Sequence, residues 1–252
     1  MHVVITGASS GIGLALARHY LEAGAVVAAF ARRAELLEQL SAQYPGRVHT
    51  SALDVRDAAA LQQAAQAAIA RFGPPDVVIA NAGVSHGTVT DDAADEDVFR
   101  DIMDINVLGM VKTFQPFLAG MREARTGTLV GIASVAGFRG LPGSGAYSAS
   151  KAAAIAYLEA LRVELRGSGV RVVTICPGYI RTPMTASNRF HMPFLIDADD
   201  AARRMARVIE QRRSFVVIPW QMAIAGKVLS WLPNWVYDPL FSRVPRKRRR
   251  TA

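Results

Sequence analysis

Short apolar runs alternate with segments of helical periodicity along most of the chain. The first run, "HVVIT" at residues 2–6, has the length of a strand, and after it Ile12, Leu16 and Tyr20 recur at helical spacing until Gly24. Later runs of Val, Ile and Ala do not alternate with polar residues, which is typical of strands covered on both faces. Because strands that alternate with helices pair in parallel, the pattern predicts an α/β fold: a doubly wound parallel sheet of about seven strands with helices on both faces.

The predicted elements run from residue 2 to residue 219. Strands are expected at residues 2–6, 25–30, 47–55, 76–83, 127–134, 170–178 and 214–219. Helices are expected at residues 11–24, 34–44, 58–73, 96–124, 145–169 and 197–213. A chain of 252 residues with this composition fits one domain, with a core at residues 1–218 and a C-terminal extension of the same domain at residues 219–252.

A glycine-rich loop follows the first strand and opens the first helix. In "TGASSGIG", residues 6–13, Gly7 permits a tight turn, Gly11 lets the backbone approach a pyrophosphate, and Gly13 lets the helix pack closely. A flexible turn is the plainer alternative, but ligands of such sheets bind beyond the carboxyl ends of the strands, where this loop lies. The loop therefore predicts a Rossmann-type dinucleotide site that includes Gly7, Ser9, Ser10, Gly11, Ile12 and Gly13.

The end of the second strand bears on the choice of dinucleotide. Proteins that prefer NAD usually carry Asp or Glu there, about 20 residues beyond the glycines, to bind the ribose hydroxyls. This chain reads Phe30-Ala31-Arg32-Arg33, and Glu35 already lies within the next helix. Two solvated arginines are the alternative, but cations at a helix N-terminus are unfavourable unless an anion lies nearby. The sequence predicts NADP(H), with Arg32 as the main ligand of a 2′-phosphate and Arg33 assisting.

The stretch "YSASK" places Tyr147 and Lys151 four residues apart in a predicted helix. Residues at this spacing lie on one face, so the lysine ammonium can reach the tyrosine hydroxyl. The usual pKa of tyrosine is about 10, and a nearby ammonium favours the phenolate and lowers that pKa. The pair is either an acid with a tuned pKa or part of a solvated helix surface.

Seven features in order carry a family resemblance. They are "TGASSGIG", Asp54 after the third strand, "NAG" at residues 81–83, Asn106, Ser134, "YSASK", and "PG" at residues 177–178. This order resembles the short-chain dehydrogenase/reductase family over residues 2–218. The resemblance implies an NADP-dependent oxidoreductase that transfers hydride between a nicotinamide and a carbonyl or secondary alcohol. It also implies a homodimer or homotetramer, with the Asn106 and Tyr147 helices at the interface.

The resemblance implies which residues contact the cofactor. Asp54 would accept a hydrogen bond from the adenine amino group, "NAG" would lie along the adenosine, and the residues after Pro177 would face the nicotinamide. A helix cap, a tight turn and a strand end are the respective structural alternatives. Ala80 departs from the family, because many members carry another Asn there. The cofactor residues outside the glycine loop are then Arg32, Arg33, Asp54, Val55, Asn81, Ala82, Gly83, Tyr147, Lys151, Pro177, Gly178, Ile180 and Thr182.

The catalytic residues implied by the resemblance are Asn106, Ser134, Tyr147 and Lys151. Reduction of a carbonyl builds negative charge on its oxygen, so the site needs a proton donor and a fixed hydrogen-bond donor. Tyr147 would be the acid/base, Ser134 would hold the substrate oxygen, and Lys151 would also bind the nicotinamide ribose. Asn106 would hold a water that links Lys151 to solvent; an Asn inside an apolar helix is unfavourable unless its amide is used.

The substrate is expected to be hydrophobic or lipid-like. The loop "YIRTPMTASNRFHMPFLIDADD", which covers the substrate in the family, is rich in Met, Phe and Leu, although these residues can also serve only to pack the loop. The alternative function is a non-catalytic NADP(H)-binding sensor, or a protein that binds membrane or nucleic acid on the same fold. The five His residues are scattered and lack metal-ligand spacing, so no metal is expected.

The formal net charge of +8 belongs mainly to the C-terminal tail. Residues 243–250, "RVPRKRRR", hold six basic residues. The other 23 basic and 21 acidic residues leave a body of charge +2, which argues against nucleic-acid binding. All three Trp precede this run in an apolar segment, a pattern typical of a peripheral anchor on an anionic membrane surface. The alternative is a segment that completes the pocket or a subunit interface. One Cys and no leader-like N-terminus predict a cytoplasmic protein, peripheral at the membrane if the extension binds lipid.

Overall fold

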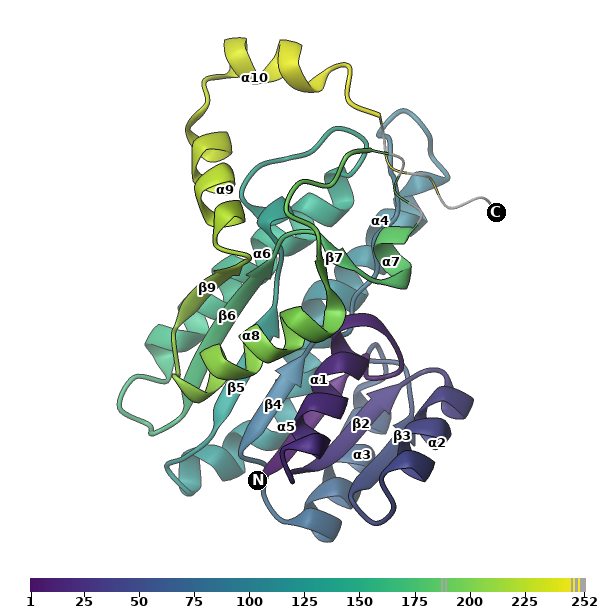
Figure 1. The fold of residues 1–252 in the computed structure, drawn as a ribbon, viewed down its shortest axis with the longest axis vertical. Coiled ribbons are helices and arrows are strands. Elements are labelled where there is room, and N and C mark those ends of the chain that lie inside the picture. Colours follow the sequence, from purple (N-terminus) through teal and green to yellow (C-terminus); the bar gives the residue numbers. More distant parts are fainter. Residues whose placement is uncertain (187, 189, 246, 248, 250–252) are drawn as a thin grey trace.

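The structure is a computed structural model that describes residues 1–186, 188, 190–245, 247 and 249. Its centre is a seven-stranded sheet in the order β3-β2-β1-β4-β5-β6-β9, and every pairing is parallel (Figure 1). The strands are β1 (His2–Thr6), β2 (Val26–Ala31), β3 (Val48–Ala52), β4 (Val77–Ala80), β5 (Thr128–Ile132), β6 (Arg171–Pro177) and β9 (Phe215–Ile218). The predicted fold class is confirmed.

Helices cover both faces of the sheet. One face carries α1 (Gly11–Glu22), α2 (Ala34–Gln43) and α8 (Ala198–Glu210), and the other carries α3 (Ala58–Phe72), α5 (Gly109–Glu123) and α6 (Gly145–Glu164). Successive strand residues point to opposite layers, so Val3 and Ile5 join the first core and Val4 joins the second. All three are fully buried, which explains why the strands read as unbroken apolar runs.

The long helix expected at residues 96–124 is interrupted by a wider turn. It consists of α4 (Asp95–Met103), a π-helical turn at Asp104–Leu108, and α5. The turn contains Asn106, whose amide hydrogen-bonds outside the helix. Such π turns often occur at functional sites, and hydrophobic periodicity does not signal them.

Three short elements lie between β6 and α8. The strands β7 (Ile180–Arg181) and β8 (Ile196–Asp197) form a small parallel sheet, and α7 (Pro183–Ala186) follows β7. The sequence prediction treated this region as a loop, because two-residue strands have no readable period.

The extension begins at the carboxyl end of β9. It contains α9 (Gln221–Trp231) and α10 (Asn234–Phe241), which extend beyond the strand ends (Figure 1). A Cβ at Gly178 would lie 2.6 Å from the Met222 side chain, so α9 packs tightly on the loop after β6. The extension therefore lies at the edge of the sheet where the predicted site residues gather.

Candidate active site

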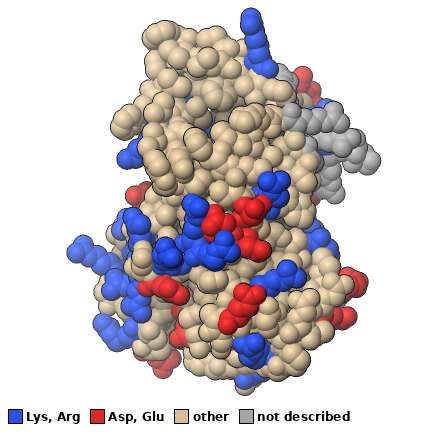
Figure 2. All heavy atoms as spheres, in the orientation of Figure 1, with Lys and Arg blue, Asp and Glu red and all other residues tan. Residues whose placement is uncertain are grey.

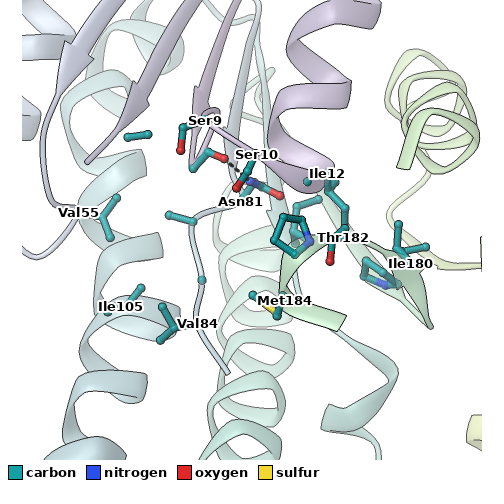
Figure 3. A pocket seen from close by; sticks show the side chains of 18 of the residues that line it. Ser9, Ser10, Ile12, Val55, Asn81, Val84, Ile105, Ile180, Thr182 and Met184 are labelled. Carbon is teal, nitrogen blue, oxygen red and sulfur yellow. Dashed lines mark hydrogen bonds between the residues drawn. The ribbon is translucent and has the colours of Figure 1, made fainter. Parts of the chain in front are cut away.

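One cleft at the carboxyl edge of the sheet contains nearly all of the predicted site residues. Figure 3 shows Ser9, Ser10 and Ile12 of the glycine loop near Asn81, with Thr182 and Met184 on another wall. The predicted residues that line the cleft are Gly7, Ser9, Ser10, Gly11, Ile12, Arg32, Arg33, Asp54, Val55, Asn81, Ala82, Gly83, Ser134, Tyr147, Lys151, Pro177, Gly178, Ile180 and Thr182. Gly13 and Asn106 do not line the cleft; the contacts below describe how each supports it.

The glycine loop is held in a conformation that ordinary side chains resist. Gly7 has φ +70° and Gly11 has φ +56°, in the left-handed region. Gly13 is required for a different reason, since a Cβ there would lie 2.4 Å from the Gly7 carbonyl oxygen. The backbone at the start of α1 can therefore approach an anionic ligand closely, as a pyrophosphate site needs.

Asn81 ties the glycine loop to the central strand β4. Its Nδ2 donates to the Thr6 carbonyl oxygen at 3.0 Å, and the Thr6 hydroxyl accepts from the backbone N–H groups of Asn81 and Ala82 at 3.2 and 3.3 Å. The "NAG" turn is thus part of the wall of the cleft, and its polar groups fix the loop that faces it.

Arg33 is the better placed of the two arginines after β2. Its Nη2 donates to Ser9 Oγ at 2.9 Å and to Ser10 Oγ at 2.6 Å, while Arg32 lines the same cleft. The guanidinium and two hydroxyls form a group of donors beside the glycine loop. The sequence prediction ranked Arg32 first, because the contact from Arg33 back to the serines depends on folding.

Asp54 already has a cationic partner in this structure. Its carboxylate receives a bond from Arg56 Nη2 at 2.8 Å, and this hydrogen bond lowers the pKa of Asp54 below its usual value. The carboxylate lines the cleft in its charged form and remains an acceptor for a further donor.

Tyr147 and Lys151 lie together on α6, as the spacing predicted. Lys151 Nζ lies 5.8 Å from the centre of the Tyr147 ring and donates to the Ile132 carbonyl oxygen at 2.9 Å. Lys151 is only 4% exposed, which excludes a solvated surface lysine. Burial lowers the pKa of Lys151 to about 8, so its ammonium is poised to lose a proton just above neutral pH.

The predicted lowering of the Tyr147 pKa was wrong for this structure. Burial raises the pKa of the Tyr147 hydroxyl above its usual 10, and the neighbouring Ser134 hydroxyl offsets only part of this rise. Desolvation disfavours the charged phenolate, and it outweighs the hydrogen bond with Ser134. Sequence spacing reports the neighbouring charge but not the burial.

Ser134 lies at the end of β5 with its side chain buried. Its Oγ accepts from the Ala136 N–H at 3.2 Å and lies 3.5 Å from the Pro177 carbonyl oxygen. Ser134 therefore caps the short turn that follows it and also lines the cleft. Its hydroxyl lies beside the Tyr147 phenol.

Asn106 supports the cleft from behind. Its Oδ1 accepts from Val84 N at 2.8 Å, and its Nδ2 donates to Val84 O and to Ser150 Oγ, each at 3.0 Å. Ser150 Oγ in turn donates to the Tyr147 carbonyl oxygen at 2.8 Å. Asn106 therefore joins the segment after β4 to the first turn of α6, and the predicted water relay stays a prediction.

Sequence reasoning missed several residues of the cleft. Most of them are apolar, and no motif marks them; three belong to the loop after β6. The missed residues are Ala31, Leu53, Val84, Ile105, Ile132, Ala133, Pro183, Met184 and Thr185. Only the richness of the loop after β6 in Met and Phe gave a signal for part of this set.

Comparison with known proteins names the family to which this fold and this cleft belong. Residues 1–192 match the short chain dehydrogenase family model. An uncharacterized oxidoreductase of Myxococcus xanthus is 42% identical over 249 residues, which cover 98% of this chain and 96% of that relative. The chain belongs to the short-chain dehydrogenase family of oxidoreductases.

Two further relatives carry more specific descriptions. A putative ketoacyl reductase of Streptomyces coelicolor is 36% identical over 75% of this chain and 74% of its own. A solved variant of actinorhodin polyketide ketoreductase with NADPH has a TM-score of 0.78 and 28% identity, covering 86% of this chain and 95% of that one.

Proposed function

We propose that the protein is an NADP(H)-dependent oxidoreductase that interconverts an apolar ketone or aldehyde and its alcohol. The observation that carries the proposal is one cleft in which Ser134, Tyr147 and Lys151 meet the glycine loop and Arg33. A hydroxyl, a phenol and a buried ammonium are the groups needed to bind and protonate a carbonyl oxygen. The ketoacyl reductase relative supports the same class of substrate.

The residues after β2 fit a 2′-phosphate. Arg33 Nη2 lies within 2.9 Å of two serine hydroxyls, and Ala31, Arg32 and Arg33 supply no carboxylate at the end of the strand. Gly13, with room for no side chain, allows the close approach that a dinucleotide needs. The NADPH held by the solved ketoreductase supports the same choice.

The proposed chemistry adds a hydride to the carbonyl carbon and a proton to its oxygen. When bound, NADPH supplies the hydride and is oxidised to NADP⁺. Ser134 donates a hydrogen bond to the substrate oxygen, and Tyr147 gives that oxygen its proton. The Lys151 ammonium stabilises the phenolate that remains until solvent returns the proton. In the oxidising direction Tyr147 takes the proton back.

The cleft favours an apolar substrate. Val84, Ile105, Ile180 and Met184 line it around the polar groups of the site (Figure 3). A pocket of this composition binds by excluding water from the substrate, while a few polar groups orient the reacting carbonyl.

Tyr147→Phe tests the proposed acid. The variant should lose at least about 100-fold in kcat, because the proton donor is gone while the ring remains. NADPH affinity, measured by calorimetry, should change little. Substantial remaining turnover would contradict the role of Tyr147, and tight NADPH binding by a wild type inactive on every carbonyl would instead indicate a cofactor sensor.

Arg33→Met tests the proposed cofactor. The wild type should bind NADPH at least about tenfold more tightly than NADH, the scale of one charge-assisted hydrogen bond. The variant should lose that preference, whereas Arg166→Met, an exposed arginine outside the cleft, should keep it. Equal wild-type affinities for the two cofactors would reject the choice of NADP(H).

We also propose that the extension docks on an anionic membrane surface. An apolar stripe runs along one face of α9 and begins at the residue just before it: Trp220, Ile224, Val228 and Trp231, each more than half exposed. Figure 2 shows that the surface over α9 and α10 is almost free of charge. Lys227 lies beside the stripe, so tryptophan and a cation occur together, as at membrane interfaces. Among the described residues, none of the helices has the length and apolar character needed to cross a bilayer.

Vesicle co-sedimentation at physiological salt tests the docking. The wild type should pellet with anionic vesicles, and Trp231→Glu should stay in the supernatant because a charge then enters the stripe. Phe99→Glu, a change of an exposed residue on α4, is the control and should pellet like the wild type. Failure to pellet combined with self-association through Trp231 would assign the stripe to a second copy of the chain.

A homodimer or homotetramer is proposed from the outer helices. Leu108, before α5, is 48% exposed and Val163 on α6 is 59% exposed. These are the helices that carry Asn106 and Tyr147, so association there would hold the walls of the cleft together.

A further inference from the structure

The C-terminal arm, meaning described residues 242–245, 247 and 249, returns to the substrate side of the molecule. Arg249 Nε donates to Asp95 Oδ2 at 3.0 Å, and its Nη2 pairs with Asp92. The Arg249 backbone also forms a bridge with Gly87. In Figure 1 the arm descends from α10 toward the segment that precedes α4. Two acids and a backbone contact therefore fix the arm at this place.

The same arm brings Lys247 to the catalytic tyrosine. Lys247 Nζ donates to Ser85 Oγ at 2.6 Å and lies 5.5 Å from the centre of the Tyr147 ring. Ser85 follows Val84, which lines the cleft and is held by Asn106. The Tyr147 ring thus has one ammonium near it from α6 and a second from the arm.

Lys247 and Arg249 of the arm differ in their partners. Arg249 has two carboxylates, whereas Lys247 has no carboxylate within 4.0 Å among the described residues. Lys247 is half-buried, and burial lowers its pKa to about 8. A cation that loses water without gaining a counter-charge costs free energy, and a bound anion would recover part of that cost. A solvated basic tail would not place Lys247 in this way.

We propose that Lys247 and Ser85 form a subsite for an anionic oxygen group of the substrate, a carboxylate or a phosphate, close to the carbonyl that is reduced. The inference rests on the proposed function and makes it more specific. The substrate is then an amphiphile, with an apolar body in the cleft and a charged group beside Tyr147. The hydroxyl of Ser85 and the ammonium of Lys247 both donate to the same anion.

Lys247→Met tests the subsite with paired substrates. A series of oxo acids, with the carbonyl at increasing distance from the carboxylate, is compared with their methyl esters and with oxo-alkyl phosphates. The wild type should prefer the charged member of at least one pair by about tenfold or more in kcat/KM, the size of one charge-assisted hydrogen bond. Lys247→Met should remove that preference and leave the ester unchanged. Comparison of the oxo acids with the oxo-alkyl phosphates shows which anion the site binds.

Two variants serve as controls. Lys247→Arg keeps the charge and should keep most of the preference. Arg243→Met removes an exposed cation of the same arm and should behave as the wild type. An equal loss of kcat/KM for acid and ester in Lys247→Met would show that the residue serves folding. An equal gain of kcat/KM for both would show that Lys247 blocks access to the cleft. Either result would overturn the proposal.

A binding measurement separates this proposal from the proposed function. Decanoate and decyl phosphate cannot be reduced, and their affinity for the NADPH-loaded protein can be measured by calorimetry. Weaker binding of either by about tenfold in Lys247→Met, with no change in Arg243→Met, supports the subsite even if no ketone is turned over. Equal affinities in the wild type and Lys247→Met would reject the subsite even if ketones are reduced.

Discussion

At the scale of single residues, Gly13 shows how tightly the start of α1 packs against Gly7 and Asn81. A Cβ at this position would lie 2.4 Å from the Gly7 carbonyl oxygen and 2.5 Å from Asn81 Nδ2. Both neighbours are fixed, because the oxygen belongs to the backbone and Asn81 holds Thr6. Any side chain must therefore push α1 away from the turn that it closes.

Gly13→Ala should lower NADPH affinity by at least about tenfold and reduce the free energy of unfolding by about 1–3 kcal/mol, the usual cost of overpacking. Gly120→Ala is the matched control, since its Cβ would meet nothing within 4 Å on helix α5. That change should be neutral or stabilise by up to about 1 kcal/mol. Calorimetry and urea unfolding measure both effects, and equal behaviour of the two variants would contradict the packing argument.

The buried Lys151 should make the free energy of unfolding depend on pH. Its pKa falls from 10.5 to about 8 on folding, so between these values the unfolded chain binds the extra proton. Stability therefore rises with pH in this window, and the cost of the buried ammonium is fully present below it. The free energy of unfolding of wild type minus that of Lys151→Met should increase from about pH 8 to about pH 10.5 in urea titrations. A difference that stays flat would show that Lys151 titrates normally.

The sequence identified residues of the site better than it identified their hydrogen-bond partners. Tyr147 and Lys151 were found because their spacing is local, and Ser134 was found through the family resemblance. The bonds from Arg33 to Ser9 and from Lys247 to Ser85 join positions far apart in the chain, and no local pattern encodes them. Burial of Tyr147 is likewise a property of the folded chain, which is why the direction of its pKa shift was predicted wrongly.

At the scale of elements, Arg139 holds the extension to the loop that precedes α6. Its guanidinium donates to Leu229 O at 2.9 Å and to Asn234 Oδ1 at 2.8 Å, and it lies 4.0 Å from the centre of the Tyr237 ring. It thus satisfies a carbonyl at the end of α9 and fixes the turn into α10.

Arg139→Met should loosen α9 and α10 without disturbing the sheet. Hydrogen exchange should become at least about tenfold faster in residues 221–241, since one planar fork of donors is lost. Exchange in β1 should be unchanged and serves as the internal control. Arg139→Lys should behave almost like Arg139→Met, because an ammonium cannot reproduce the fork; full protection in the lysine variant would show that charge alone suffices.

Long elements were predictable and fine breaks in them were not. The strands near residues 2–6 and 170–178 and the helix beginning near residue 145 match the structure closely, because their apolar pattern is long and uniform. The π turn around Asn106 was not predicted, although Asn106 was noted as a polar residue in an apolar helix. The two-residue strands β7 and β8 carry too few residues for any pattern.

At the scale of the whole molecule, the sheet of parallel strands was the easiest feature to predict. The five inner strands, β2, β1, β4, β5 and β6, are almost fully buried, so their apolar runs are visible without knowledge of their neighbours. The proposed association of copies of the molecule is not encoded in such runs. It depends on which outer faces are apolar, and the folded chain exposes Leu108 and Val163 on the helices around the cleft.

Light scattering after gel filtration tests this assembly. The wild type should elute as a dimer or tetramer, and Val163→Glu should form a smaller species because a charge replaces an exposed apolar contact. Val163→Ala should remain assembled. A monomeric wild type would reject the proposed association at this surface.

The positions of the three tryptophans have a practical consequence for spectroscopy. Trp220, Trp231 and Trp235 are the only indoles of the chain, and they are 63%, 78% and 79% exposed in the folded state. None of them reports on the sheet, and unfolding changes their surroundings little. A melting curve followed by tryptophan emission would therefore miss the cooperative loss of the core, whereas far-ultraviolet circular dichroism would record it. The same indoles offer a label-free optical signal for events at the extension alone.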